Sequence, residues 1–117
     1  FGVKRREDWR ELVEPALRRD RERWLLHYDP RIAVPFKSVT PAGAAAAEAA
    51  MWSLYDAIRG PTLIVRGEHS DLLTRDTLAE MQSRGPRAAG AEVPGVGHAP
   101  TFMFEHEIAL VRDFLLA

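Results

Sequence analysis

Two short loops carry the residues of this chain that are best suited to chemistry. One is the segment 66–71 (RGEHSD), and the other is the segment 95–100 (GVGHAP). Asp71 lies in the first loop and His98 in the second. A carboxylate beside an imidazole fixes the tautomer of the ring and stabilises the imidazolium that forms when the ring takes a proton. The pair predicts an orienting acid and a general base, which are two of the three members of a hydrolytic triad.

Each loop follows an apolar segment that predicts a strand. Residues 62–66 (TLIVR) form a mostly aliphatic run, typical of a parallel strand that is covered on both faces. Residues 91–94 (AEVP) predict a second, shorter strand ahead of His98. In open parallel sheets, sites form beyond the carboxyl ends of the strands. We therefore expect Asp71 and His98 to lie at the same edge of one sheet.

Helices are predicted between and after these strands. Thr74 is expected to cap a helix that runs to about Arg84, where the Gly–Pro pair at 85–86 ends it. Residues 102–116 predict a last helix, with apolar side chains at helical spacing. The second half of the chain therefore predicts a strand–helix–strand–helix unit, which is a right-handed parallel crossover.

The first half of the chain gives weaker signals. Residues 8–11 (DWRE) resemble a capping box, which predicts a helix over residues 9–20. Pro15 lies inside that helix and is expected to kink or split it. Residues 24–28 are expected to be extended, and the alanine-rich stretch 44–57 is expected to be helical.

The part of the chain from Trp52 to the C-terminus resembles the C-terminal end of an α/β-hydrolase fold protein. The stretches that carry the resemblance are WSLYDAI (52–58), PTLIVRG (61–67), SD (70–71) and VGHAP (96–100). In that family a glycine and the catalytic acid commonly follow the penultimate core strand, and the catalytic histidine follows the last strand. The resemblance implies that Asp71 is the triad acid and His98 the triad base, and that no cofactor is needed.

The nucleophile motif of that family does not occur in this sequence. The family places its nucleophile in Gly-x-Ser-x-Gly, on a strained turn between a strand and a helix. No serine of this chain lies between two glycines at that spacing; the serines are Ser38, Ser53, Ser70 and Ser83. The family order is nucleophile, acid, base, so the resemblance implies a nucleophile outside this chain. We therefore expect the isolated chain to be an inactive fragment of a hydrolase.

These observations predict the fold class α/β, as an incomplete α/β-hydrolase fold. Residues 1–50 are expected to form a helical cap or lid segment. Residues 51–117 are expected to form the C-terminal part of the core, with two parallel strands and flanking helices. Two strands alone do not make a stable sheet, and an unpaired apolar strand edge invites another chain. The chain is therefore expected to pair with the missing N-terminal portion or to associate with itself.

The resemblance implies hydrolysis of an ester or a related small apolar substrate. Trp52 and Leu72 are candidates for lining the substrate pocket, and packing in the core is an equal alternative for Trp52. Glu68 is the alternative acid, and Arg66 at the end of its strand is expected to form a structural ion pair. Two other functions remain open: a non-catalytic binding or scaffold protein of the same fold, and acyl transfer or C–C bond cleavage on the same triad.

Composition narrows the remaining classes of function. The net charge is −1 and there is no cysteine, so nothing favours nucleic acid as a partner, and thiolate chemistry is excluded. No apolar stretch approaches the roughly 20 residues of a membrane span. With no signal peptide in the sequence, a cytoplasmic protein that acts on a small molecule is expected. His69, His98 and His106 lack a closed set of ligands, so no metal site is predicted.

Overall fold

The computed structural model describes residues 2–117 and divides them into two compact units. Residues 50–117, together with Gly2, make the larger unit. The smaller unit is Val3–Ala49. The two candidate loops belong to the larger unit, so this unit positions the site.

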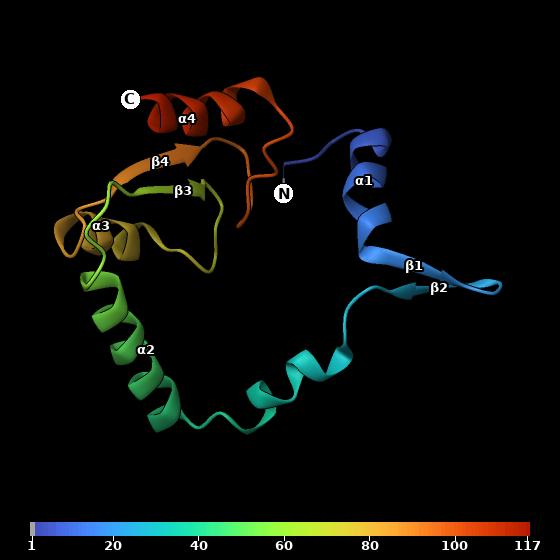
Figure 1. Ribbon diagram of the computed structural model, residues 1–117, viewed down its shortest axis with the longest axis horizontal. Coiled ribbons are helices and arrows are strands. Elements are labelled where there is room, and N and C mark those ends of the chain that lie inside the picture. The colour runs from blue at the N-terminus through green and yellow to red at the C-terminus, as the bar shows by residue number, and fades with distance from the viewer. Residues whose placement is uncertain (1) are drawn as a thin grey trace. The chain divides into compact units, whose positions relative to one another are not determined.

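A parallel pair of strands forms the centre of the larger unit. Strand β3 spans Leu63–Gly67 and strand β4 spans Ala89–Val93, and Val65 is paired with Ala91. The arrowheads of both strands point to the same end of the unit (Figure 1). The predicted parallel pair is confirmed, although β4 begins two residues before the predicted start.

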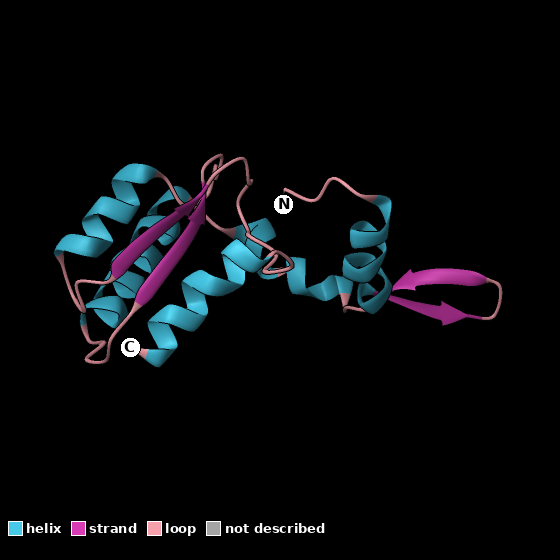
Figure 2. Ribbon diagram, turned by 90° about the horizontal axis from the view of Figure 1, so that it is seen from above, coloured by secondary structure: helices cyan, strands magenta, loops and turns pink. Residues whose placement is uncertain are grey.

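Two helices lie on opposite sides of this strand pair (Figures 1 and 2). Helix α3 spans Arg75–Ser83 and makes the crossover from β3 to β4. The predicted cap is confirmed, because the Thr74 side chain accepts a hydrogen bond from the backbone nitrogen of Thr77 at 3.0 Å. Helix α4 spans Glu105–Leu116 and begins later than predicted, because Phe102 has a left-handed φ of 54° that no helix accommodates.

Helix α2, Pro41–Asp56, precedes β3 and covers most of the predicted alanine-rich helix. It begins three residues before the predicted start, because the residues of its first turn favour a helix start. Pro41 occupies the first position, where its missing N–H costs nothing. The Thr40 hydroxyl accepts a hydrogen bond from the Gly43 nitrogen at 3.1 Å and so acts as a cap.

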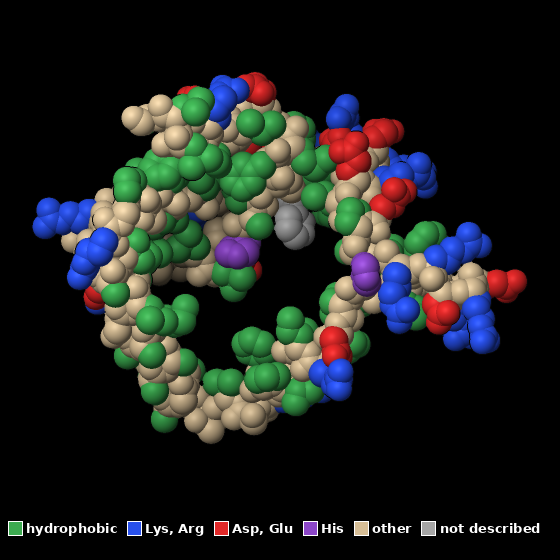
Figure 3. Space-filling model, in the orientation of Figure 1, with side chains coloured by type: hydrophobic (Ala, Val, Ile, Leu, Met, Phe, Trp, Pro, Cys, Tyr) green, Lys and Arg blue, Asp and Glu red, His purple; other side chains and the backbone are tan. Residues whose placement is uncertain are grey.

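The larger unit buries little apolar surface. Its buried apolar side chains among the described residues are Ala88, Val93 and Val96, and Val93 alone is fully buried. Leu115 and Leu116 at the end of α4 are 71% and 80% exposed. Apolar side chains show at the surface of both units in the space-filling view (Figure 3). Within residues 2–117, β3 and β4 form a sheet of two strands, each with an unpaired outer edge.

The smaller unit differs from the prediction. Helix α1 spans only Arg6–Val13, and a 3₁₀ turn at Glu14–Ala16 follows it. Strands β1 (Leu17–Asp20) and β2 (Arg23–Leu26) then form an antiparallel hairpin. The expected helix over residues 9–20 is therefore wrong beyond Val13. Of the two effects expected of Pro15, a kink or a split, the structure shows an interruption: the α-helix ends ahead of it and no helix follows the 3₁₀ turn before the hairpin. The expected extended segment at residues 24–28 is confirmed in part by β2.

The predicted capping box at residues 8–11 is also wrong. Arg5 is the N-cap of α1 and makes no side-chain cap. The Asp8 carboxylate instead accepts a hydrogen bond from Arg5 Nε at 2.9 Å, which holds it away from the first backbone nitrogens. Two further 3₁₀ turns, Pro30–Ala33 and Pro35–Ser38, lead to α2. Across the described residues, no helix combines the length and hydropathy that crossing a bilayer requires.

Candidate active site at the carboxyl ends of the parallel strands

The two candidate loops are tied together by backbone hydrogen bonds. The Glu68 nitrogen donates to the Val93 carbonyl at 2.9 Å, and the His69 nitrogen donates to the Val96 carbonyl at 2.9 Å. These bonds continue the pairing of β3 with β4 beyond the last residues of the strands. The loops after the two strands therefore act as one piece, at the edge of the sheet where the sequence places Asp71 and His98.

Gly67 permits this close approach. A Cβ atom at this position would lie 2.6 Å from the Val96 carbonyl oxygen and closer still to that of Gly97. Real Cβ atoms essentially never approach another atom so closely. The glycine is therefore required by space and not by an unusual φ. Its place directly after an apolar strand was visible in the sequence, but the neighbour that excludes a side chain was not.

Glu68, the alternative acid, has a different task. Its carboxylate accepts a hydrogen bond from the Gly95 nitrogen at 2.8 Å. Gly95 adopts a φ of 68°, which turns the chain sharply after β4. Glu68 thus stabilises the turn that precedes His98, and none of its hydrogen bonds within the described residues reaches the imidazole.

His98 receives a hydrogen bond partner from the first loop. The Ser70 Oγ atom lies 2.9 Å from His98 Nδ1. The same Oγ atom accepts a hydrogen bond from the Leu73 nitrogen at 3.0 Å, so Ser70 also closes its own turn. Ser70 is buried, whereas the His98 side chain reaches the surface. Sequence reasoning missed Ser70; the available signal was a serine three residues before a turn end, which commonly bonds the backbone.

Asp71 is the next residue of the same turn and is exposed. Its side chain makes no hydrogen bond to any residue of the described chain, and its carboxylate does not bond His98. The structure therefore brings Ser70 to the imidazole and leaves Asp71 one residue away. The role of Asp71 as the acid stays a prediction.

Arg66 holds the turn that carries Ser70 and Asp71. It is 3% exposed, and it donates from Nε to the Leu73 carbonyl at 2.9 Å and from a terminal nitrogen to the Ser70 carbonyl at 3.2 Å. Its other terminal nitrogen pairs with Glu92, the residue opposite it on β4. The ion pair expected for Arg66 is confirmed.

Glu92 joins this network to α3. Arg75 binds its two carboxylate oxygens at 2.9 and 3.1 Å. The hydrogen bond from Arg75 lowers the pKa of the Glu92 carboxyl below its ordinary value, and the hydrogen bond from Arg66 lowers it further. The ionised carboxylate therefore connects the strand pair, the crossover helix and the turn that contacts His98.

The two predicted pocket residues lie in different places. The Trp52 ring on α2 lies under the Arg84 guanidinium, 4.5 Å from its carbon, and meets Tyr55 edge-on. Arg84 in turn pairs with Asp56 at 2.6 Å. These contacts join α2 to the end of α3 and favour the packing alternative for Trp52. Leu72, beside Asp71, is 72% exposed.

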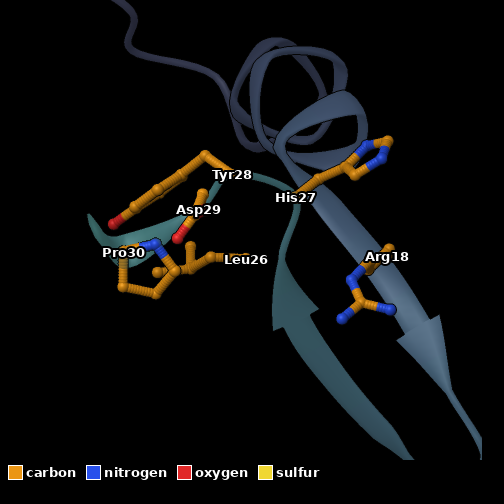
Figure 4. A pocket seen from close by; sticks show the side chains of 6 residues that line it. All are labelled: Arg18, Leu26, His27, Tyr28, Asp29 and Pro30. Carbon is orange, nitrogen blue, oxygen red and sulfur yellow. The ribbon is translucent and has the colours of Figure 1, made fainter. Parts of the chain in front are cut away.

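A separate hollow of about 410 Å³ lies in the smaller unit, at the base of the hairpin. Arg18, Leu26, His27, Tyr28, Asp29 and Pro30 line it (Figure 4). The His27 ring points away from Asp29 in this view, and the Asp29 carboxylate is bound by Arg31 at 2.6 Å. No acid–base pair is therefore formed here. Within the described residues, no group of three or more His, Asp or Glu side chains is placed to hold a metal ion.

Comparison with known proteins adds independent evidence. The chain is 50% identical over 118 residues to the 3-hydroxybutyrate-oligomer hydrolase of Cupriavidus necator. This alignment covers 97% of the present chain and 40% of that protein. The crystal structure of an α/β-hydrolase from Novosphingobium aromaticivorans matches with a TM-score of 0.73 and 33% identity. That match covers 94% of this chain and 38% of the solved chain. No protein-family model matches the sequence.

Proposed function

We propose that His98 is the general base of an ester hydrolase, because the chain has the fold of the C-terminal part of an α/β-hydrolase, as its sequence predicts. The supporting observation is the position of His98 beyond the carboxyl ends of β3 and β4, with Nδ1 bonded to Ser70. Nε2 makes no hydrogen bond within the described residues, so it is available for a proton. Asp71 supplies negative charge on the neighbouring turn.

The chemistry follows from these positions. A nucleophilic hydroxyl outside this chain attacks the ester carbonyl while His98 takes its proton. The alkoxide leaves with that proton, and the acyl group stays on the nucleophile. His98 then takes a proton from water, which attacks the acyl group. The bond between the acyl group and the nucleophile breaks, the nucleophile oxygen takes the proton back from His98, and the acid is released. In both steps Asp71 balances the charge of the imidazolium.

The proposed substrate class is a short oligoester of a hydroxy acid. The relative from Cupriavidus necator is named for hydrolysis of 3-hydroxybutyrate oligomers, and the chain shares half of its aligned residues with it. Such oligomers consist of hydroxy acids joined by ester bonds, the bond type on which this mechanism acts. The exposed Leu72 side chain next to Asp71 is proposed as an apolar wall for the acyl group.

The nucleophile is proposed to come from polypeptide beyond these residues, since the chain spans about two fifths of each relative. The unpaired strand edges and the exposed apolar side chains support a covering partner. We propose that residues 1–50 supply the cap or lid segment of the hydrolase.

His98→Gln tests the proposal in the polypeptide that includes the nucleophile. We expect kcat for 3-hydroxybutyrate dimer and for p-nitrophenyl butyrate to fall by about 10²- to 10⁴-fold, because the general base is lost. Asp71→Asn is expected to lower kcat as well, with KM nearly unchanged. His106→Gln is the matched control, since His106 is exposed on α4 and stacks on Phe104. Near-normal kcat in His98→Gln would refute the assignment of the base.

A further inference from the structure

The hydrogen bond between Ser70 and His98 assigns a role beyond the acid and the base. Ser70 is 9% exposed, and its Oγ atom lies 2.9 Å from His98 Nδ1. We propose that Ser70 is the positioning residue of the imidazole: its hydroxyl oxygen accepts the Nδ1 hydrogen and so keeps Nε2 unprotonated and turned toward the nucleophile. This inference rests on the proposed function and deepens it.

The hydrogen bonding capacity of the Ser70 hydroxyl leaves two arrangements. A hydroxyl has one hydrogen to donate and two lone pairs to accept with. The Leu73 nitrogen uses one lone pair at 3.0 Å. If the hydroxyl donates to Nδ1 of His98, the ring proton lies on Nε2, which then cannot act as a base. If Nδ1–H donates to the second lone pair, Nε2 is free, and only this arrangement serves catalysis.

Asp71 follows Ser70 directly, but its carboxylate makes no hydrogen bond within the part of the chain that the structure describes. The proposed positioning of the ring therefore depends on the Ser70 hydroxyl, which contacts Nδ1 at 2.9 Å. Asp71 contributes negative charge from the neighbouring residue and not a hydrogen bond to the imidazole.

Arg66 makes the position of Ser70 well defined. Its guanidinium donates to the Ser70 carbonyl at 3.2 Å and to the Leu73 carbonyl at 2.9 Å, which are the two ends of the turn. The group is planar and presents its donors in fixed directions. Glu92 on the neighbouring strand holds it from the other side. Arg66 therefore fixes the backbone of the turn, and the Leu73 nitrogen holds the Ser70 hydroxyl itself.

The first test reads the tautomer of His98 directly, in the wild-type polypeptide without substrate. Nitrogen-15 NMR of the neutral ring distinguishes a protonated Nδ1 from a protonated Nε2. We expect the proton on Nδ1, with a cross-peak pattern that changes in Ser70→Ala. A proton on Nε2 would overturn the proposal, and so would an unchanged ring spectrum in Ser70→Ala. The readout does not depend on activity, and the tautomer of the wild-type ring does not depend on the stability of any variant.

The second test is kinetic. Ser70→Ala is expected to lower kcat for p-nitrophenyl butyrate by about 10- to 100-fold, the scale of one hydrogen bond to a group that becomes charged. KM is expected to change little, because the hydroxyl contacts the base and not the ester. Ser83→Ala removes a hydroxyl that bonds only the Glu80 carbonyl on α3 and serves as the control. Unchanged kcat in Ser70→Ala, or a loss confined to KM, would overturn the proposal.

The outcomes separate this inference from the function on which it rests. If His98→Gln keeps its activity, the proposed base is wrong, whatever Ser70 does. If His98→Gln is inactive while Ser70→Ala is fully active, the base stands and the positioning role of Ser70 falls. Loss of kcat in both variants, with the ring proton on Nδ1, supports both statements.

Discussion

Replacing Gly67 by alanine tests whether the close approach of the two loops sets the position of His98. The added Cβ would lie 2.6 Å from the Val96 carbonyl oxygen and closer still to that of Gly97. Both neighbours are backbone atoms, so no flexible side chain can give way and the second loop itself must move. Relieving the overlap displaces the chain next to His98 by roughly 1 Å, and misplacement on that scale costs about 100-fold in rate.

We therefore expect Gly67→Ala to lower kcat by about 100-fold, and to destabilise the fold by about 1–3 kcal/mol as overpacking does. The assay measures kcat and KM for p-nitrophenyl butyrate, with urea unfolding of the same sample. The unfolding curve separates a displaced base from a protein that has lost its fold. Gly60→Ala is the matched control, because a Cβ at Gly60 meets no atom within 4 Å.

The reasoning is refuted if Gly67→Ala is folded and its kcat stays within about twofold of the wild-type value. Such a result would mean that the loops separate without disturbing His98, or that the imidazole is positioned by contacts other than those across this gap. A loss of kcat in Gly60→Ala of the same size would also refute it, since that substitution changes no contact of the two loops.

Two further predictions concern the elements that support the site. Thr74→Ala removes the cap of α3 and is expected to lower the free energy of unfolding by about 1 kcal/mol. Ser83→Ala at the other end of α3 should change it less in urea unfolding; an equal loss would contradict a capping role. The pKa of Glu92 is lowered from 4.5 by Arg75 and then by Arg66, so its stabilisation is complete above pH 4.5 and is lost as the pH falls through the lowered value. Glu92→Gln is therefore expected to be less stable at neutral pH and to show a shallower loss of stability in acid; an unchanged acid slope would contradict this.

The strand–helix–strand unit was predictable because its signals are local. The apolar run ahead of Gly67 identifies β3 to within one residue, and Thr74 identifies the start of α3. The prediction for the first half of the chain was wrong because the signals that define its structure are not local. A hairpin is defined by pairing across strands, and the paired residues here are rich in arginine, so no alternation of apolar side chains marks it. Pro15 was recognised as a point where the helix is interrupted, but the residue type alone did not indicate that a hairpin follows it.

The site was predictable to the level of its loops but not of its contacts. His98 follows its strand as expected, and the first loop faces it. Which side chain of that loop meets the imidazole depends on the path of the turn between Ser70 and Leu73, which Arg66 determines through its bonds to backbone carbonyls. Hydrogen bonds to backbone carbonyls cannot be predicted from residue types, because every residue has a backbone carbonyl.

The contact between Gly67 and the chain at Val96–Gly97 also affects where two related hydrolases can be recombined into a chimaera. A chimaera that takes residues 50–117 from one parent inherits the glycine together with the turn that fits against it. A crossover between β3 and β4 would join the glycine of one parent to the turn of another, and a small difference in either loop would then open the gap. Some recombination experiments aim to combine the acyl preference of one hydrolase with the base of another. For these the suitable crossover point lies ahead of β3, and not between β3 and β4.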